Sequence, residues 1–354
     1  MNELTNILAE TVERLFRDLM TEGMPQAENQ SAFAHMWNAI EELGITNLFL
    51  SEENGGFEGE WLDAFSVFKL LGSHALPLPV GETIVAKKLL QDCDMKIPDA
   101  AITIGTARKV NIQRNKNSEQ WLFSGEVPLL PWGQTVQSAL IQCHFDDKNY
   151  YALLSTKHAS LITRDFNQAN EPRDTLRFVN CPVMDLKLLD NNVDNLFSSG
   201  AMLRTCQVAG ALEAALELSI QYVQERKQFG KSISKFQVIQ HQLALLAEHC
   251  AATNCAAQSA CSASDQGDGN FEIAAAKLRA NRAVAESTSI AHQVHGAIGF
   301  TQEYRLHYFT QRLWSWRSEF GNDRHWARYL GNQIIQAEPS ELWANLTARS
   351  DARG

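Results

Sequence analysis

The spacing of apolar residues changes twice along this chain of 354 residues, and these changes constrain its fold. In the first hundred residues, and again after residue 194, apolar side chains recur every three or four residues, the period of one helix face. Between about residues 101 and 189 they form short runs separated by Asn, Asp, Gly and Pro, a pattern typical of strands. The chain is therefore predicted to be an α+β protein with a helical domain over 1–100, a β-barrel or sandwich over 101–190 and a helical bundle over 191–354.

Individual elements follow from the same pattern. Helices are expected around 4–15, 37–43 and 62–72, and Pro77 with Pro79 predicts an extended link before residue 80. Three later helix faces are lined by Leu212, Leu216, Ile220 and Val223, by Ile239, Leu243, Leu246 and Cys250, and by Leu306, Phe309, Leu313 and Trp316. The strand candidates are 102–104, 109–112, 121–123, 139–141, 150–154, 161–163 and 176–179.

Composition excludes several classes of function. The net charge of −10 and the absence of dense Lys/Arg runs argue against nucleic-acid binding. No run approaches the roughly 20 apolar residues of a membrane span, and the N-terminus lacks the basic start and apolar core of a signal peptide. The 7 cysteines are odd in number and form no CxxC pair. We therefore expect a cytoplasmic protein with reduced thiols.

One segment carries a candidate phosphate-binding group. Residues 222–237 read Tyr-Val-Gln-Glu-Arg-Lys-Gln-Phe-Gly-Lys-Ser-Ile-Ser-Lys-Phe-Gln, which places Arg226 at the end of a predicted helix and Gly230 in the turn after it. A guanidinium can direct two N–H donors at a phosphate and stays charged at any working pH. Taken alone, a helix-terminal arginine is better explained by its favourable interaction with the helix dipole.

Longer strings favour the phosphate interpretation through a resemblance. Arg226-Lys-Gln-Phe-Gly-Lys with Phe236-Gln237, and the later Gln293-Val-His-Gly, are similar to the C-terminal signatures of the acyl-CoA dehydrogenase family. Glu53-Asn-Gly-Gly resembles a stretch near the N-terminus of that family, and the order of helices, strands and helices fits it across the whole chain. The resemblance implies an N-terminal helical domain, a middle β-barrel or sandwich and a C-terminal four-helix bundle. It also implies an FAD-dependent oxidoreductase that desaturates an acyl-CoA thioester and passes electrons to an electron-transfer flavoprotein.

In that family, these motifs bind the diphosphate and adenosine end of an FAD held by the neighbouring subunit. Carried over position by position, the resemblance implies the cofactor-binding set Arg226, Gln228, Phe229, Gln237, Gln293, Val294, His295, Gly296 and Ala297. Ala297 is a departure, because the family commonly has a second glycine there and a methyl group could crowd a phosphate. His292 and His295 lack a third ligand in the sequence and are expected to pack or hydrogen-bond, so no metal site is predicted.

The family's catalytic base is missing from its usual place. Desaturation requires a carboxylate beside the substrate α-carbon, and the family's spacing from Gln293 leads to Phe320. Glu319 lies one residue early, which on a helix is about 100° of rotation, and is the remaining candidate. Some relatives place the base on an earlier helix, but here that region, 197–201, offers no carboxylate, and Ala201 replaces the usual arginine.

The segment that would contact the flavin ring also departs from the family. No Thr-Glu-Pro and Gly-Ser-Asp string is present, and Trp121-Leu-Phe-Ser-Gly125 and Pro131-Trp-Gly-Gln-Thr135 resemble degenerate versions of the strands around it. The hypothesis is therefore a half-site subunit of a heterotetrameric acyl-CoA dehydrogenase of lipid metabolism, similar to those of bacterial steroid degradation. A homologous partner would supply the base. The alternatives are a self-sufficient homomeric dehydrogenase using Glu319, a flavin monooxygenase of the same fold, and a purely structural subunit.

Overall fold

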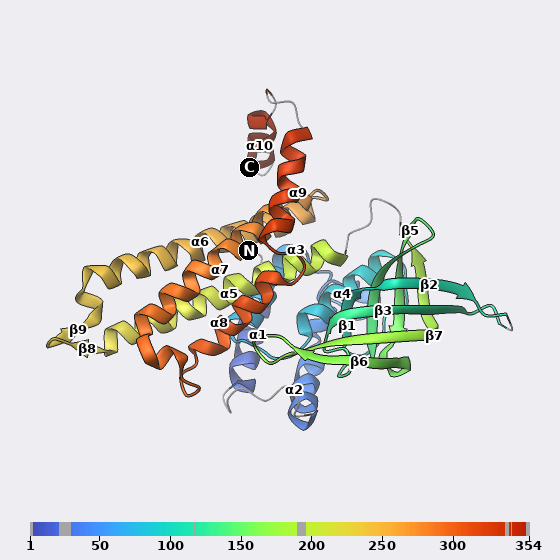
Figure 1. The fold of residues 1–354 in the computed structure, drawn as a ribbon, viewed down its shortest axis with the longest axis horizontal. Coiled ribbons are helices and arrows are strands. Elements are labelled where there is room, and N and C mark those ends of the chain that lie inside the picture. The colour runs from blue at the N-terminus through green and yellow to red at the C-terminus, as the bar shows by residue number, and fades with distance from the viewer. Residues whose placement is uncertain are drawn as a thin grey trace.

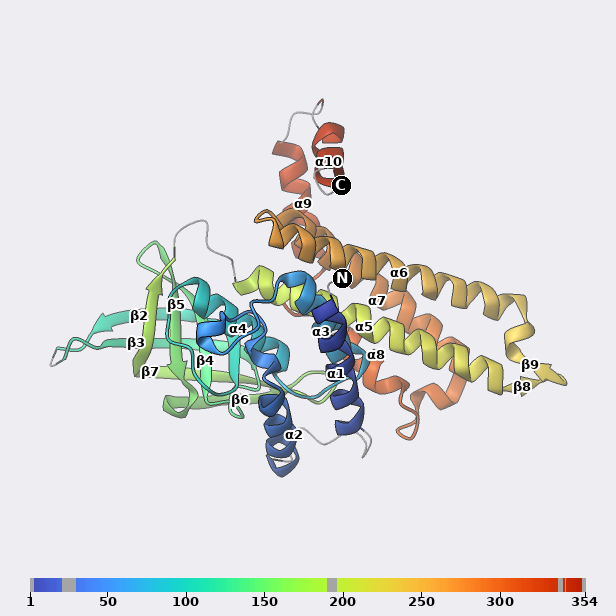
Figure 2. The same ribbon diagram turned by 180° about the vertical axis from the view of Figure 1, so that it is seen from behind.

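The computed structural model describes residues 3–20, 30–116, 118–189, 196–336, 340 and 342–351. The elements follow the chain as a group of helices, a sheet and a second, longer group of helices. In Figures 1 and 2 the sheet and the long helices lie at opposite ends of the molecule, with the N-terminal helices between them. This arrangement confirms the predicted α+β fold class.

In the first region the described residues form the α-helices α1 (Glu3–Leu19), α2 (Gln30–Leu43), α3 (Trp61–Ser73) and α4 (Val80–Asp92). The sequence pattern predicted the first three and the link at Pro77 and Pro79, but not α4. Helix α4 starts directly after Pro79 and is buried on nearly every side, including Glu82 and Lys87. A helix enclosed on all sides has no exposed face, and therefore leaves no amphipathic pattern in the sequence.

The second region is a 7-stranded sheet in the order β1-β4-β5-β7-β3-β2, with β6 also paired to β7. Its strands are β1 (Ile102–Thr106), β2 (Arg108–Arg114), β3 (Trp121–Pro131), β4 (Ser138–Phe145), β5 (Lys148–Ser155), β6 (Ala159–Phe166) and β7 (Pro172–Leu188). Each strand candidate from the sequence falls inside one of them. Strand β7 pairs with β3, β5 and β6, which curves the sheet into a half-barrel.

The third region contains α5 (Leu196–Glu225), α6 (Gln237–Asp265), α7 (Asn270–His295), α8 (Leu306–Ser318), α9 (Asp323–Gln336) and α10 (Leu342–Asp351). Helices α5 to α8 pack as the predicted four-helix bundle, and α9 and α10 project from it (Figure 1). A short hairpin of β8 (Lys227–Gln228) and β9 (Lys231–Ser232) joins α5 to α6. None of the helices in the described part of the chain is long and apolar enough to cross a membrane.

Helix α5 connects the bundle to the N-terminal helices. A Cβ atom at Gly210 would lie 1.9 Å from the Lys69 carbonyl oxygen, and one at Gly72 would lie 2.0 Å from that of Gln207. Only glycine permits backbones to approach this closely. The crossing of α3 over α5 therefore fixes the N-terminal region on the bundle.

Candidate functional site

The first cofactor motif lies at the end of α5. Arg226 is the first residue after the helix, and the turn of the following hairpin is made by Phe229 (φ 53°) and Gly230 (φ 77°). The hairpin is held by backbone hydrogen bonds from Arg226 to Tyr222 and from Ile233 to Arg226, both 2.9 Å. The guanidinium of Arg226 is exposed, and no partner for it is found among the described residues. Phe229 is 90% exposed and its ring meets that of Phe236 edge to face at 6.2 Å, so the hairpin presents an exposed cation and an exposed aromatic ring.

The second motif lies at the end of α7. Gly296 follows the helix with φ 65°, a conformation that favours glycine. Gln293 and Gly296 border a cleft of about 390 Å³. The residues lining this α7–α8 cleft are Ala285, Thr288, Ser289, His292, Gln293, Gly296, Phe300 and Trp314. Ala297 is exposed, so its methyl group displaces nothing within this chain.

The two motifs meet at one end of the bundle. The Tyr222 ring, one turn before Arg226, stacks on the His295 ring with centroids 4.7 Å apart. His295 also contacts the Tyr304 hydroxyl through Nε2 at 3.1 Å and the Ala291 carbonyl through Nδ1 at 2.7 Å. Burial of the imidazole lowers its pKa. His295 therefore joins the ends of α5 and α7 as a neutral, packed side chain.

The nine residues carried over from the resemblance divide into two sets. The side chains of Val294 and His295 are buried in the bundle. The exposed side chains are those of Arg226, Gln228, Phe229, Gln237, Gln293 and Ala297. Gly296 is also exposed but has no side chain. His292 packs as expected: Nε2 lies 3.1 Å from the Thr310 hydroxyl and the ring stacks on Phe300 at 4.3 Å. Among the described residues, no three His, Cys, Asp or Glu side chains are grouped to hold a metal ion.

The two regions at which the resemblance predicts the catalytic base, Phe320 and 197–201, lie side by side. Phe320 has φ 51°, and its ring lies against the first turns of α5. A Cβ atom at Gly200 would be 2.5 Å from Cδ1 of Phe320, and the ring of Phe197 lies 6.1 Å away, edge to face. An aromatic ring therefore occupies the volume beside both positions.

Glu319, the neighbouring residue, forms hydrogen bonds with two arginines. Its Oε1 accepts a hydrogen bond from Arg173 Nε at 2.9 Å, and its Oε2 accepts one from Arg204 Nε at 2.7 Å. Burial opposes ionisation of this carboxyl, but Arg173 and Arg204 outweigh that effect and lower its pKa to about 2. Such a carboxylate is a poor proton acceptor near neutral pH.

These arginines belong to a buried network that joins all three regions. Arg204 on α5 is 1% exposed and also donates to Glu82 of α4 at 2.6 Å. Arg173 of β7 pairs with Glu171 at 3.3 Å, and Arg312 of α8 pairs with the same carboxylate at 2.9 Å. Sequence reasoning missed this network because Glu319 is 115 and 146 residues from its partners.

The loop that carries Glu319 and Phe320 is held in place by hydrogen bonds that involve Lys277 of α7. Its ammonium group donates to the Trp316 carbonyl at 2.8 Å and to the Asn281 amide oxygen at 2.6 Å. Asn281 in turn donates to the Gly321 carbonyl at 3.2 Å. Burial lowers the pKa of Lys277 to about 7.

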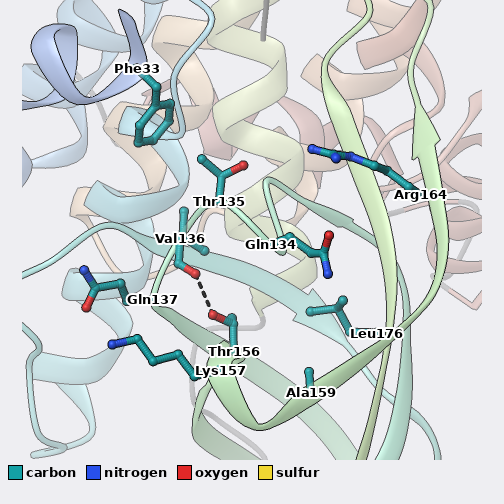
Figure 3. A pocket seen from close by; sticks show the side chains of 10 residues that line it. All are labelled: Phe33, Gln134, Thr135, Val136, Gln137, Thr156, Lys157, Ala159, Arg164 and Leu176. Carbon is teal, nitrogen blue, oxygen red and sulfur yellow. Dashed lines mark hydrogen bonds between the residues drawn. The ribbon is translucent and has the colours of Figure 1, made fainter. Parts of the chain in front are cut away.

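The segment that resembles the flavin-ring strand leads into a second, larger cleft. Trp132 is only 2% exposed, and the Phe33 ring of α2 lies 5.8 Å from it. Beside them is a polar cleft of about 770 Å³, shown in Figure 3. The residues lining this sheet-edge cleft are Phe33, Gln134, Thr135, Val136, Gln137, Thr156, Lys157, Ala159, Arg164 and Leu176.

Comparisons with known proteins agree with the motifs. Residues 192–323 match the model of the acyl-CoA dehydrogenase C-terminal domain. Acyl-CoA dehydrogenase IpdE2 of Mycobacterium tuberculosis is 26% identical over 304 residues, which cover 85% of this chain and 87% of the relative.

Solved structures share the fold over nearly the full length. The ChsE4–ChsE5 complex from Mycobacterium tuberculosis matches with a TM-score of 0.84 at 16% identity, covering 96% of this chain and 99% of that one. A variant of the steroid ACAD Tcur3481–Tcur3483 matches with a TM-score of 0.80 at 18% identity, covering 94% and 99%.

Proposed function

We propose that this chain, whose residues 192–323 match the model of the acyl-CoA dehydrogenase C-terminal domain, is the half-site subunit of a heteromeric acyl-CoA dehydrogenase. In this proposal the chain binds the diphosphate and adenosine end of FAD across the subunit interface. A homologous partner supplies the catalytic base and the flavin-ring pocket. When bound, FAD accepts the hydride from the substrate β-carbon.

The observation that supports the proposal is the packing of an aromatic ring in the two regions where the resemblance predicts the catalytic base. Phe320 packs against Gly200, so neither place offers a carboxylate. Removal of an α-proton needs a base whose pKa is suited to the task. The adjacent Glu319 is committed to Arg173 and Arg204 with its pKa lowered to about 2, which argues against the self-sufficient homomeric alternative.

Arg226, Gln293 and Gly296, together called the clamp, have the chemistry needed to bind the diphosphate and adenosine end of FAD. Arg226 is exposed, has no partner among the described side chains, and sits on a hairpin fixed by backbone hydrogen bonds. It would bind the diphosphate as a permanent cation. Gln293 and Gly296 border the α7–α8 cleft at the same end of the bundle, where they would bind the adjoining part of the dinucleotide. A purely structural subunit would have no use for this free cation.

The segment that would contact the flavin ring argues against a flavin monooxygenase of the same fold. Such an enzyme needs no α-proton base, but it does need an open face for the isoalloxazine ring. Trp132, in the segment that would border the ring, is 2% exposed. The faces of this residue are therefore already covered by the chain itself.

The proposed substrate class follows the solved relatives. Tcur3481–Tcur3483 is a steroid ACAD, and the ChsE4–ChsE5 structure is a complex of two different subunits. We accordingly place this chain in a complex that acts on a steroid-derived or similarly bulky acyl-CoA, with an electron-transfer flavoprotein as acceptor.

The test is flavin content of the chain expressed alone and co-expressed with a homologous subunit encoded nearby. The proposal requires little flavin alone and about one flavin per pair of subunits in the complex. Arg226→Ala should weaken flavin binding by the complex by roughly tenfold or more, the cost of one charged hydrogen bond. Arg328→Ala, which removes an exposed cation from α9, is the matched control. Full flavin occupancy in the Arg226 variant would remove the clamp assignment, and dehydrogenase activity of the chain alone would overturn the half-site role.

A further inference from the structure

The structure assigns a site of reversible oxidation to the buried thiols of Cys206 and Cys261, which a small peroxide converts into a disulfide between α5 and α6. The two Sγ atoms lie 3.8 Å apart, in hydrogen-bond contact. Neither cysteine has any exposed surface, and both belong to the core cluster that α5 and α6 share with the N-terminal helices. Neither lines the sheet-edge cleft or the α7–α8 cleft, so the inference does not depend on the proposed function.

The two helices lie close enough for such a bond. Helices α5 and α6 run side by side along the bundle (Figures 1 and 2). Met202, one turn before Cys206 on α5, accepts a hydrogen bond at its sulfur from Ser264 Oγ of α6 at 3.8 Å. The helices therefore meet on two successive turns. An S–S bond is about 2.05 Å long, so the sulfur atoms must approach by about 1.8 Å from their present 3.8 Å. Side-chain rotation together with a helix shift of about 1 Å covers this distance.

The partner of each thiol distinguishes this pair from other cysteines of the chain. Cys143 and Cys181 donate to backbone carbonyl oxygens, and Cys255 is exposed on α6. Cys206 and Cys261 instead have each other's sulfur as hydrogen-bond partner. This arrangement allows a sulfenic acid formed on one cysteine to condense with the thiol of the other.

The oxidant reaches the pair when the last turn of α6 opens. Asp265 ends that helix, and its carboxylate accepts hydrogen bonds from the backbone N–H groups of Trp61 at 2.7 Å and Leu62 at 3.1 Å, where α3 begins. Residues 265–268 are exposed, and Cys261 lies one turn before them.

The closed chain protects the thiol. The hydrogen bond with Cys206 and burial raise the pKa of Cys261 well above its usual range, so that its thiol is protonated and unreactive near neutral pH. Helix ends open more readily than the core, and opening of this end removes both effects. A small peroxide then meets Cys261 first.

The oxidation proceeds in two balanced steps. In the first, the Cys261 thiolate attacks one oxygen of hydrogen peroxide and the O–O bond breaks. Cys261 becomes a sulfenic acid, and the other oxygen leaves with the thiol proton as water. In the second, the Cys206 sulfur attacks the sulfenic sulfur, the S–S bond forms, and the hydroxyl leaves with the Cys206 proton as a second water. The two thiols lose two hydrogen atoms, and one peroxide is reduced to two waters. A thiol reductant reverses the change.

The experiment is peptide mapping of the full chain carrying Cys255→Ser, which removes the exposed thiol, after treatment with hydrogen peroxide. Free thiols are alkylated under denaturing conditions before digestion, so a linked peptide found by mass spectrometry reports a bond formed in the folded chain. The expected product is one linked pair that contains Cys206 and Cys261 and that dithiothreitol separates. Intact thiols at both positions, separate sulfinic acids, or links to other cysteines would overturn the inference.

Variants and a stability measurement locate the bond. Cys206→Ser and Cys261→Ser should each remove the linked pair, whereas Cys250→Ser, at another buried cysteine of α6, should keep it. The disulfide closes a loop that runs from α5 through the β8–β9 hairpin to α6, and loop closure lowers the entropy of the unfolded chain. The urea midpoint of the unaltered chain should therefore rise on oxidation and return with dithiothreitol. A midpoint that falls on oxidation would show that the bond does not fit the folded helices.

The route of the oxidant has its own test. Asp265→Ala should speed formation of the linked pair by about fivefold, the change in an opening equilibrium expected when a helix loses a capping carboxylate. Glu119→Ala, which removes an exposed carboxylate from a turn of the sheet, should leave the rate unchanged. Equal rates in the two variants would exclude entry at the end of α6.

Discussion

The ring of Phe320 lies directly over Gly200, so that a Cβ atom on that glycine would be 2.5 Å from the ring carbons Cδ1 and Cε1. Gly200 lies on α5 and Phe320 in the turn after α8, yet both lie in regions where the resemblance predicts a catalytic carboxylate. The ring is supported further by Phe197 and by a hydrogen bond from Trp326 Nε1 to the Phe320 carbonyl at 3.0 Å. The volume around Phe320 and Gly200 is thus filled by packed side chains.

Gly200→Ala should destabilise the chain by about 1–3 kcal/mol, because the added methyl group overpacks the contact with Phe320. The double variant Gly200→Ala/Phe320→Leu should recover part of that loss, since the shorter side chain vacates the space. Denaturant unfolding of the single and double variants measures both effects. Gly331→Ala is the control, because nothing lies within 4 Å of a Cβ there. Additive losses in the double variant would contradict the packing relationship.

Glu319→Gln should lower the free energy of unfolding by about 3 kcal/mol, because it removes the carboxylate shared by the buried Arg173 and Arg204 and leaves each with a single acidic partner among the described residues, Glu171 and Glu82. If Glu319 were a general base, the same substitution would abolish activity and spare stability. Thermal or urea unfolding of the variant separates the two roles. An unchanged unfolding midpoint would show that the arginines do not depend on this carboxylate.

The same carboxylate predicts a dependence of stability on acid. The pKa of Glu319 is about 2 in the folded chain and 4.5 in the reference state. Since the folded value is the lower one, its contribution is fully present above pH 4.5 and is lost as the pH falls towards 2. The stability difference between the wild type and Glu319→Gln should therefore shrink across this window. A difference that stays constant from pH 6 to pH 3 would contradict the assignment.

The sequence predicted those features that local spacing determines. Periodic apolar residues located the strands and most helices, and the position of Arg226 at a helix end followed from the residues around it. The enclosed helix α4 was not predicted, because a helix buried on all sides has no amphipathic face.

The contacts between residues of the site could not be predicted from the sequence pattern. The resemblance, through its spacing from Gln293, predicted Phe320 at the position of a base, but the sequence gave no sign that Phe320 contacts Gly200. Nor did it indicate that Glu319 pairs with Arg173 and Arg204, or that His295 packs on Tyr222. Pairings between residues this far apart in sequence depend on the complete tertiary fold. The spacing of apolar residues along the chain therefore does not predict them.

Lys277 provides a last test at alkaline pH. Its pKa is lowered by burial to about 7 from 10.5, although Glu319 and Asp323 raise it and Arg204 and Arg317 lower it further. Between pH 7 and 10.5 the unfolded chain keeps a proton that the folded chain has released, so stability should rise with pH by up to about 1.4 kcal/mol per unit. Lys277→Met should flatten this rise, whereas Lys148→Met, at an exposed position, should not. Urea unfolding at several pH values measures the slope, and parallel curves for wild type and Lys277→Met would refute the prediction.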